Sequence, residues 1–150
     1  MWPMNDLLVD ASVAVKWLIA EEYSDQSLAL LDEAYRQEWR FICPPHFTSE
    51  VINVLYRRTR RNEPSFHLNP DDASEALDEF FNLEFEAIRA EELYRHAWAV
   101  ASEYQISSIY DALYVALADL HATPVWTADH RLVRTVGDAN LVRWIGDYEG

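Results

Sequence analysis

Short apolar runs alternate along the chain with longer segments whose apolar residues recur every three or four positions. A short apolar run bounded by polar residues or proline is typical of a buried strand, whereas the longer period is typical of an amphipathic helix. The sequence predicts strands over 6–11, 40–45, 83–88, 124–128 and 141–145. It predicts helices over 12–22, 24–38, 46–61, 71–82, 90–104, 107–122 and 129–137.

The strands and helices alternate, and this order predicts an α/β fold. Strands joined through helices form parallel sheets covered by helices on both faces. We therefore expect a three-layer α/β/α sandwich with a mainly parallel central sheet of about five strands. Residues 62–70 are rich in proline and asparagine and predict a loop, but one too short to link two domains. The sequence thus predicts a single domain over 1–150.

Four acidic residues stand out against this pattern. Asp10 ends the first apolar run, and Asp129 follows the run that contains Thr127. Glu50 and Asp111 lie on helices among apolar neighbours. Sites in parallel sheets lie at the carboxyl ends of the strands, so we expect these acids to meet at that edge.

Carboxylates gathered in one crevice require a compensating charge. Buried acids repel one another, and oxygen ligands are those preferred by Mg²⁺ and Mn²⁺. Such a site suits hydrolysis of a phosphodiester bond. Three of the acids have a structural alternative when taken alone: Asp10 or Asp129 as a helix cap, Glu50 as a solvated or arginine-paired residue. For Asp111 we favour a functional role. Ser12 is a further candidate for the cap of helix 12–22.

Composition narrows the class of protein. The chain has 12 Lys and Arg against 26 Asp and Glu, a net charge of −14 that argues against nonspecific DNA binding through a basic surface. Its one cysteine excludes an intramolecular disulfide and a cysteine-cluster zinc site, and we expect Cys43 to be buried. No apolar stretch is long enough to span a membrane, and the first residues include Asp6 and Asp10 rather than a signal sequence. We expect a soluble, cytoplasmic protein without a membrane partner.

Four of the few cations cluster near the end of helix 46–61. The cluster consists of Arg57, Arg58, Arg60 and Arg61. Three interpretations remain open: the arginines contact phosphates beside the acidic crevice, they favourably oppose the dipole at a helix end, or they attract an acidic neighbour. Lys16, on the first helix, could contact substrate, but we expect it in solvent.

Several segments together resemble the PIN-domain ribonucleases, in particular the VapC-type toxins of toxin–antitoxin pairs. The resemblance runs from about residue 6 to 145 and is carried by LLVDASVAVKW, SEVINVL, SSIYDALYVALA and VWTADHRLV. It implies a PIN-like fold and a metal-dependent endoribonuclease. Asp10, Glu50, Asp111 and Asp129 would form its acidic quartet, with Asp10 and Asp111 as the main ligands of Mg²⁺ (or Mn²⁺). Ser12 and Thr127 would hydrogen-bond around that site.

The same resemblance implies partners: an RNA substrate, a cognate antitoxin protein whose tail covers the acidic site, and a second copy in a homodimer. Two alternatives stay open, a PIN-like RNA-processing nuclease outside toxin–antitoxin systems and a nonenzymatic partner-binding scaffold. An aspartyl-nucleophile phosphatase would have a second acid where Ser12 stands, and a phosphoacceptor receiver domain would have a late lysine, whereas the last lysine here is Lys16.

Overall fold

The computed structural model describes residues 6–60 and 67–150. Its strands are short, and each lies inside a range that the sequence predicts. They are β1 (Asp6–Leu7), β2 (Arg40–Cys43), β3 (Glu86–Ala87), β4 (Val125–Thr127) and β5 (Val142–Trp144). The helices are α1 (Ala11–Leu18), α2 (Ser24–Arg36), α3 (Phe47–Arg58), α4 (Pro70–Phe81), α5 (Glu91–Tyr104), α6 (Ile109–His121) and α7 (His130–Val136), followed by a 3₁₀ turn (Ile145–Asp147).

The strands are all parallel. β2 pairs with β1 on one side and β3 on the other, and β4 pairs with β5. A parallel bridge between Val9 and Trp126 joins the two groups, so the strands follow the order β3-β2-β1-β4-β5. The predicted parallel sheet is therefore confirmed. Every carboxyl end lies at the same edge, which brings the residues after β1 and β4 together.

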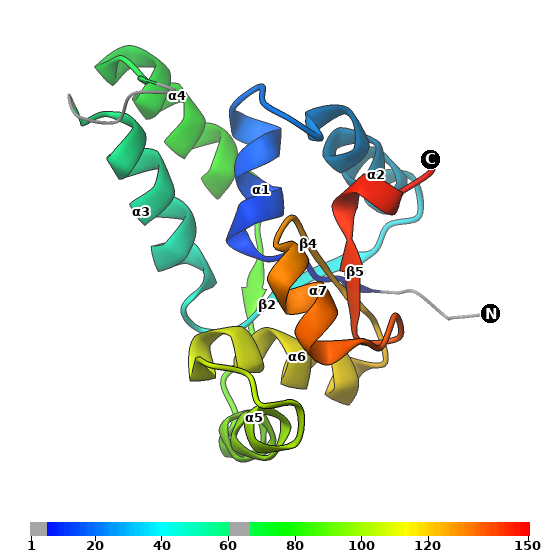
Figure 1. The fold of residues 1–150 in the computed structure, drawn as a ribbon. Helices are drawn as coiled ribbons and strands as arrows, with labels where there is room; N and C mark the ends of the chain where they lie inside the picture. Colours follow the sequence, from blue (N-terminus) through cyan, green and yellow to red (C-terminus); the bar gives the residue numbers. More distant parts are fainter. Residues whose placement is uncertain (1–5, 61–66) are drawn as a thin grey trace.

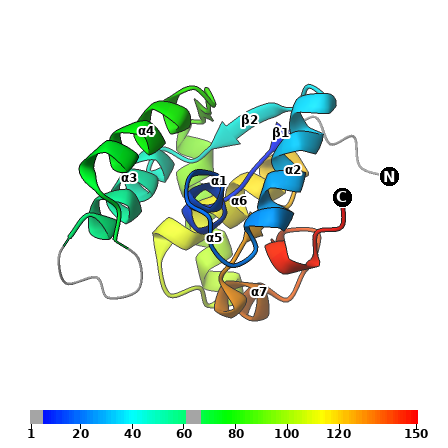
Figure 2. The ribbon, with the colours of Figure 1, turned by 90° about the horizontal axis from the view of Figure 1, so that it is seen from above.

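The helices form layers on the two sides of this sheet. Helices α5 and α6 pack against each other on one side, at the bottom of Figure 1, and α1 and α2 lie on the other. Helix α3 packs beside α1, and α3 and α4 extend together away from the body of the molecule, as the view from above in Figure 2 also shows. None of the helices in the described ranges has the length and apolar character needed to cross a membrane.

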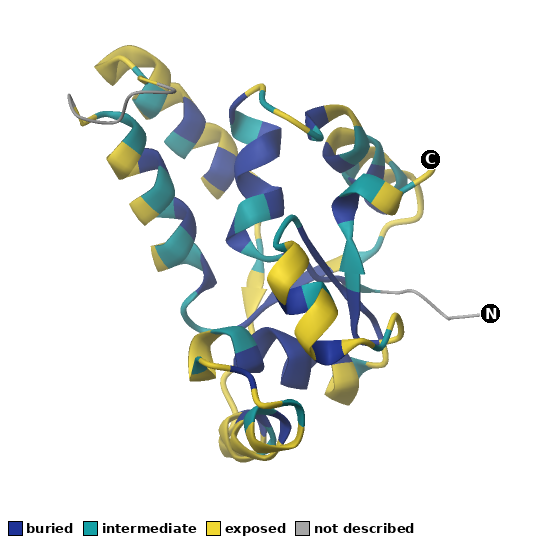
Figure 3. Cartoon of the chain, in the orientation of Figure 1, coloured by how far each residue is buried: buried dark blue, intermediate teal, exposed yellow. Residues whose placement is uncertain are grey.

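The core lies between these layers. Leu8, Val9, Val13 and Ala14 are fully buried, and α6 contributes a nearly continuous buried segment from Ala112 to Ala118. Figure 3 shows the dark, buried stretches of α1 and α6 on either side of the sheet. Cys43 is buried at the end of β2, as expected, and burial raises the pKa of its thiol to about 11. A protonated, enclosed thiol is inert at neutral pH.

The first helix begins one residue earlier than predicted. Ser12 is not its cap. Asp10 is the N-cap and its carboxylate accepts from the Val13 N–H, because the helix starts at Ala11. The alternative for Asp129 is likewise correct, since its side chain accepts from the Arg131 N–H and caps α7. Capping fixes each carboxylate at the entrance of a helix.

Candidate active site

Asp10 lies where β1 and β4 meet at the carboxyl edge of the sheet. The Val9–Trp126 bridge and the hydrogen bond from the Asp10 N–H to the Trp126 carbonyl (3.1 Å) hold it there. This pairing sets Asp10 beside Thr127, although 117 positions separate the two in sequence. The proximity that the sheet topology predicts is thus present.

Two hydroxyl groups orient the Asp10 carboxylate. Ser12 Oγ donates to Oδ1 and Thr127 Oγ1 donates to Oδ2, each at 2.5 Å. Each hydroxyl also accepts from a backbone N–H: Ser12 from Ala128 at 2.9 Å, Thr127 from Asp129 at 3.0 Å. Because those N–H groups occupy lone pairs of the hydroxyl oxygens, the hydroxyl protons point at Asp10. The two residues therefore fix the carboxylate in one orientation.

The electrostatic setting of Asp10 is unfavourable to its charge. Burial raises its pKa to about 6, although the hydrogen bonds from Ser12, Thr127 and the Val13 N–H act to lower it. The nearby charge of Glu50 adds to the increase. In the described residues no Lys, Arg or His side chain forms an ion pair with Asp10. The uncompensated charge makes this position favourable for a bound cation.

Glu50 enters the site from the first turn of α3. Tyr114 of α6 donates its hydroxyl to Glu50 Oε1 at 2.6 Å, and His46 Nε2 lies 3.2 Å from the same oxygen. Burial acts to raise the pKa of Glu50, but the contacts with His46 and Tyr114 lower it by more. The Glu50 side chain is 39% exposed and so partly solvated, and among the described residues its carboxylate contacts Tyr114 and His46 rather than an arginine. Its lowered pKa keeps it ionised at neutral pH.

Asp111 and Asp129 line the same pocket. Asp111 lies in the first turn of α6, after the Ser108 cap, and Asp129 precedes α7. Both line a pocket of about 190 Å³. Burial raises the pKa of Asp111, and the charges of Asp129 and Glu50 raise it further. Together with the repulsion between Glu50 and Asp10, these effects place all four predicted acids in one electrostatic neighbourhood.

The donor chemistry of this neighbourhood fits a hard divalent cation. All four groups are carboxylates, and Mg²⁺ is commonly held by one or two carboxylates, waters and substrate phosphates. Within the described residues, no three His, Cys, Asp or Glu side chains form a group that could hold a metal ion. Three of the acids have partners within the protein: hydroxyls hold Asp10, Tyr114 holds Glu50, and Asp129 caps α7.

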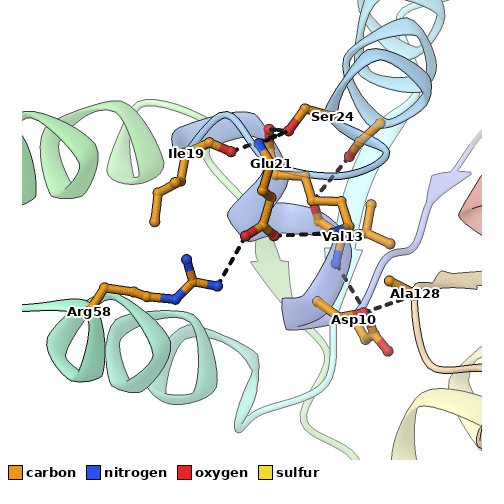
Figure 4. A network of polar contacts seen from close by, with 10 residues as sticks. Asp10, Val13, Ile19, Glu21, Ser24, Arg58 and Ala128 are labelled. Carbon is orange, nitrogen blue, oxygen red and sulfur yellow. Dashed lines mark hydrogen bonds and ion pairs between the residues drawn. The ribbon is translucent and has the colours of Figure 1, made fainter. Parts of the chain in front are cut away.

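The predicted basic cluster lies at the end of α3. Arg58 donates to Glu21 Oε2 at 3.0 Å, across the space between α3 and the loop after α1 (Figure 4). Arg57 and Arg60 are exposed, and Arg61 lies outside the described residues. An RNA contact by Arg57, Arg58, Arg60 or Arg61 stays a prediction.

The expectation for Lys16 is wrong. Its side chain is buried, and its ammonium group lies 3.1 Å from Glu21 Oε1. Glu21 therefore carries two cationic partners, Lys16 and Arg58. Ser24 fixes the loop that connects α1 and α2. Its hydroxyl accepts from the Glu21 N–H and donates to the Lys16 carbonyl, both at 3.0 Å. The position of Lys16 among apolar residues of the predicted helix was a signal in the sequence that its side chain is buried. The spacing of the residues did not identify Glu21 as its partner.

Sequence reasoning also missed two residues of the site. His46 and Tyr114 hold Glu50, and their rings pack at 5.0 Å. The ring of Tyr114 is buried in the core. The signal for its second role was its position one turn after Asp111 on an apolar helix. A buried tyrosine hydroxyl normally needs a partner.

Three comparisons with known proteins agree with this geometry. Residues 7–138 match the PIN domain family. The chain is 32% identical over 129 residues to Ribonuclease VapC3 of Pyrobaculum aerophilum, covering 84% of this chain and 91% of that protein. The crystal structure of PAE2754 from Pyrobaculum aerophilum shares the fold, with a TM-score of 0.63 at 20% identity over 94% of this chain and 92% of that one. The chain therefore belongs to the PIN domain family, and within it to the VapC-type proteins.

Proposed function

We propose that this protein is a Mg²⁺- or Mn²⁺-dependent endoribonuclease that acts as the toxin of a toxin–antitoxin pair, with one PIN domain over 1–150. The observation that supports the proposal is the mutual repulsion of acids on a PIN fold: the charge of Glu50 raises the pKa of Asp10, and the charges of Asp129 and Glu50 raise that of Asp111. The likeness to Ribonuclease VapC3 supports RNA as the substrate and toxin as the role.

Each of the predicted site residues has a separate role in the proposed reaction. Asp10 and Asp111 would be the main ligands of the cation, with Asp129 completing the site directly or through a water. Ser12 and Thr127 hold Asp10 in position to bind. Glu50, kept ionised by His46 and Tyr114, would orient a water molecule or hold a second ion. When bound, the metal ion supplies an activated water and polarises the phosphate.

The proposed partners follow from the same family. A cognate antitoxin would cover the acidic site, and a basic side chain inserted there would offset the repulsion among the carboxylates. A homodimer and a cytoplasmic location stay predictions. The surface offers apolar residues for such contacts, including Trp98 on α5, which is 72% exposed, and Tyr110 on α6.

The direct test is cleavage of a mixed RNA pool with and without Mn²⁺ or Mg²⁺. Wild-type protein is compared with Asp10→Asn and Asp111→Asn variants purified in the same way, and with Asp119→Asn as a matched control. Asp119 is an exposed acid of α6 that pairs with His96, away from the four acids. We expect metal-dependent cuts by wild type and Asp119→Asn and at least about a hundredfold slower cleavage by the other two variants.

Two results would contradict the proposal. Equal cleavage by wild type and Asp10→Asn would place the activity elsewhere or in a contaminant. Absence of metal-dependent cleavage, together with tight binding of a partner protein, would favour the nonenzymatic scaffold. Growth arrest on expression, relieved in Asp10→Asn cells, separates a toxin from an RNA-processing nuclease.

A further inference from the structure

The pocket beside Asp111 and Asp129 has a mixed polar lining that the four acids do not explain. Gln105, Ser107, Arg131 and Thr135 contribute to it along with the two acids. They come from the segment between α5 and α6 and from α7, so the pocket extends away from Asp10. Its volume of about 190 Å³ is below the roughly 300–1,000 Å³ of sites for drug-sized ligands. It suits a fragment of a nucleotide rather than a whole one.

Arg131 is the cation among the residues that line this pocket. It lines the pocket together with Asp111 and Asp129. Yet within the described chain its guanidinium forms no ion pair or hydrogen bond with either acid, and Asp129 Oδ1 instead accepts from the Arg131 backbone N–H at 2.9 Å. In contrast, the guanidinium groups of Arg40, Arg58 and Arg95 each contact a carboxylate.

We propose that this pocket binds a phosphate and ribose of the RNA strand next to the bond that is cut, and that Arg131 donates to the phosphate. A guanidinium offers a planar set of N–H donors that matches phosphate oxygens. The Gln105 amide and the Ser107 and Thr135 hydroxyls provide donors and acceptors suited to a ribose. In a chain of net charge −14, an exposed arginine without a carboxylate partner offsets the repulsion that two acids exert on an incoming phosphate.

This proposal rests on the proposed function, since it assigns a substrate contact to the same site. The alternative is that Arg131 only balances the charge of Asp111 and Asp129. The two roles differ in what they predict for RNA binding. A phosphate contact strengthens binding and steepens its dependence on salt, whereas a local charge balance affects the acids and leaves the salt dependence unchanged.

The experiment measures binding of a fluorescent, mixed-sequence, single-stranded RNA in the Asp10→Asn background, where the RNA is not expected to be cut. The variants are Arg131→Gln, Arg131→Lys and, as the matched control, Arg134→Gln. Arg134 is an exposed arginine on the same helix that does not line the pocket. Binding is measured by fluorescence anisotropy with Mg²⁺ present, at about 50 and 200 mM salt.

We expect Arg131→Gln to weaken RNA binding about tenfold at the lower salt and to reduce the salt slope by about one. Arg131→Lys keeps the charge without the planar set of donors, so its RNA affinity should lie between those of the parent and Arg131→Gln. Arg134→Gln should stay within about twofold of the parent. Melting temperatures of all variants should agree, because both arginines are exposed.

Equal binding by the Arg131→Gln and Arg134→Gln proteins would overturn the proposal, as would the absence of RNA binding by the parent. Failure of the proposed function gives a different result: no metal-dependent cleavage by wild type, while Arg131→Gln still selectively weakens RNA binding. That outcome would keep the pocket as an RNA site and remove the nuclease.

Discussion

The two ends of α1 hold buried carboxylates in opposite ways. After its C-terminal end, Glu21 contacts Lys16 and Arg58, and the ion pairs connect α1 with α3 (Figure 4). At its N-terminal end, Asp10 contacts neutral hydroxyls and backbone N–H groups, and the nearest charges are negative. A carboxylate with cationic partners stabilises the fold, whereas one without them is held ready for a ligand that brings positive charge. The two acids thus differ in their contacts, and the contacts of Asp10 agree with the cation-binding role that we propose for it.

The largest expected effect concerns Glu21, after the C-terminal end of α1. Glu21→Gln leaves the buried Lys16 ammonium without its anion, so the variant should lose about 2–3 kcal/mol of unfolding free energy, somewhat less than for a fully enclosed pair. Urea denaturation of wild type and variant measures the loss. The matched control is Glu91→Gln, which removes an exposed pair with Arg95. Such surface pairs contribute little, so this control should match wild type.

Equal stability of Glu21→Gln and Glu91→Gln would remove the structural side of the comparison. A variant that loses stability and also cleaves RNA poorly would show that the ion pairs position Glu50 as well, because α3 carries both Arg58 and Glu50. In that case, metal added at a concentration that restores the stability of Glu21→Gln should restore only part of its cleavage activity.

The second prediction concerns the functional end. A cation bound among the four acids relieves their repulsion, so Mg²⁺ or Mn²⁺ should raise the melting temperature. At a free metal concentration of 100 times Kd the gain is about 2.7 kcal/mol. For a domain of this size that is on the order of 5–10 °C. Differential scanning fluorimetry across a metal titration measures it.

The expected shift depends on the acids. Asp10→Asn and Asp111→Asn should show a much smaller increase with metal, whereas Asp119→Asn should respond like wild type. A melting temperature that does not change with metal in the wild-type protein would contradict a cation site. An equal increase in all variants would place the binding elsewhere.

The positions of Asp10 and Asp129 at the carboxyl edge of the sheet were predictable because the sheet rule is simple. Apolar runs identified the strands, helices between them implied parallel pairing, and parallel pairing put the residues after β1 and β4 at one edge. The partners of the acidic side chains were harder to predict from the sequence. Tyr114 and its partner Glu50 are 64 positions apart, and Arg58 and its partner Glu21 are 37 apart. Pairing across helices depends on packing and rotamers, which no local pattern records.

Local periodicity also left the strand lengths undetermined. The sequence predicts a strand of six residues over 83–88, but β3 comprises only Glu86–Ala87 at the exposed edge of the sheet. Alternation shows that one face is polar, yet it does not show how far a partner strand extends alongside. The acidic residues of this segment suit its place at the edge of the sheet, where charged side chains discourage pairing with another chain.

The third prediction concerns the pH dependence of stability. Asp10 has a folded pKa of about 6 against an ordinary value of 3.8, so between these pH values the folded state holds the proton more tightly than the unfolded state. Its contribution therefore lowers stability as pH rises through that interval. Asp10→Asn removes the contribution and keeps a good helix cap. In the absence of metal we expect the variant to gain about 1–2 kcal/mol over wild type at pH 7 and almost nothing at pH 4.

Urea denaturation of the two proteins at both pH values measures this difference. A loss of stability in Asp10→Asn at pH 7 would mean that the hydroxyl groups compensate the charge fully, and the contrast between the two ends of α1 would disappear. Metal reverses the order, because the ionised carboxylate is the form that binds a cation. Wild type in saturating Mg²⁺ should exceed the variant at pH 7 and lose that advantage as the pH falls below about 6.

The smallest expected effect tests the intermediate case, Glu50, which is held by one neutral donor and one histidine. Tyr114→Phe removes the hydroxyl that donates to Glu50 at 2.6 Å but keeps the ring packed against His46 and Phe47. The loss should be about 1 kcal/mol of stability, the usual contribution of one hydrogen bond. Without this donor the pKa of Glu50 should rise, so cleavage should slow several-fold at pH 6 and less at pH 8.

Tyr110→Phe is the matched control, since Tyr110 also packs on His46 but its hydroxyl contacts no described side chain. A uniform decrease at both pH values would assign Tyr114 to packing alone, whereas a decrease that is larger at low pH would show that the fold keeps Glu50 charged through this contact.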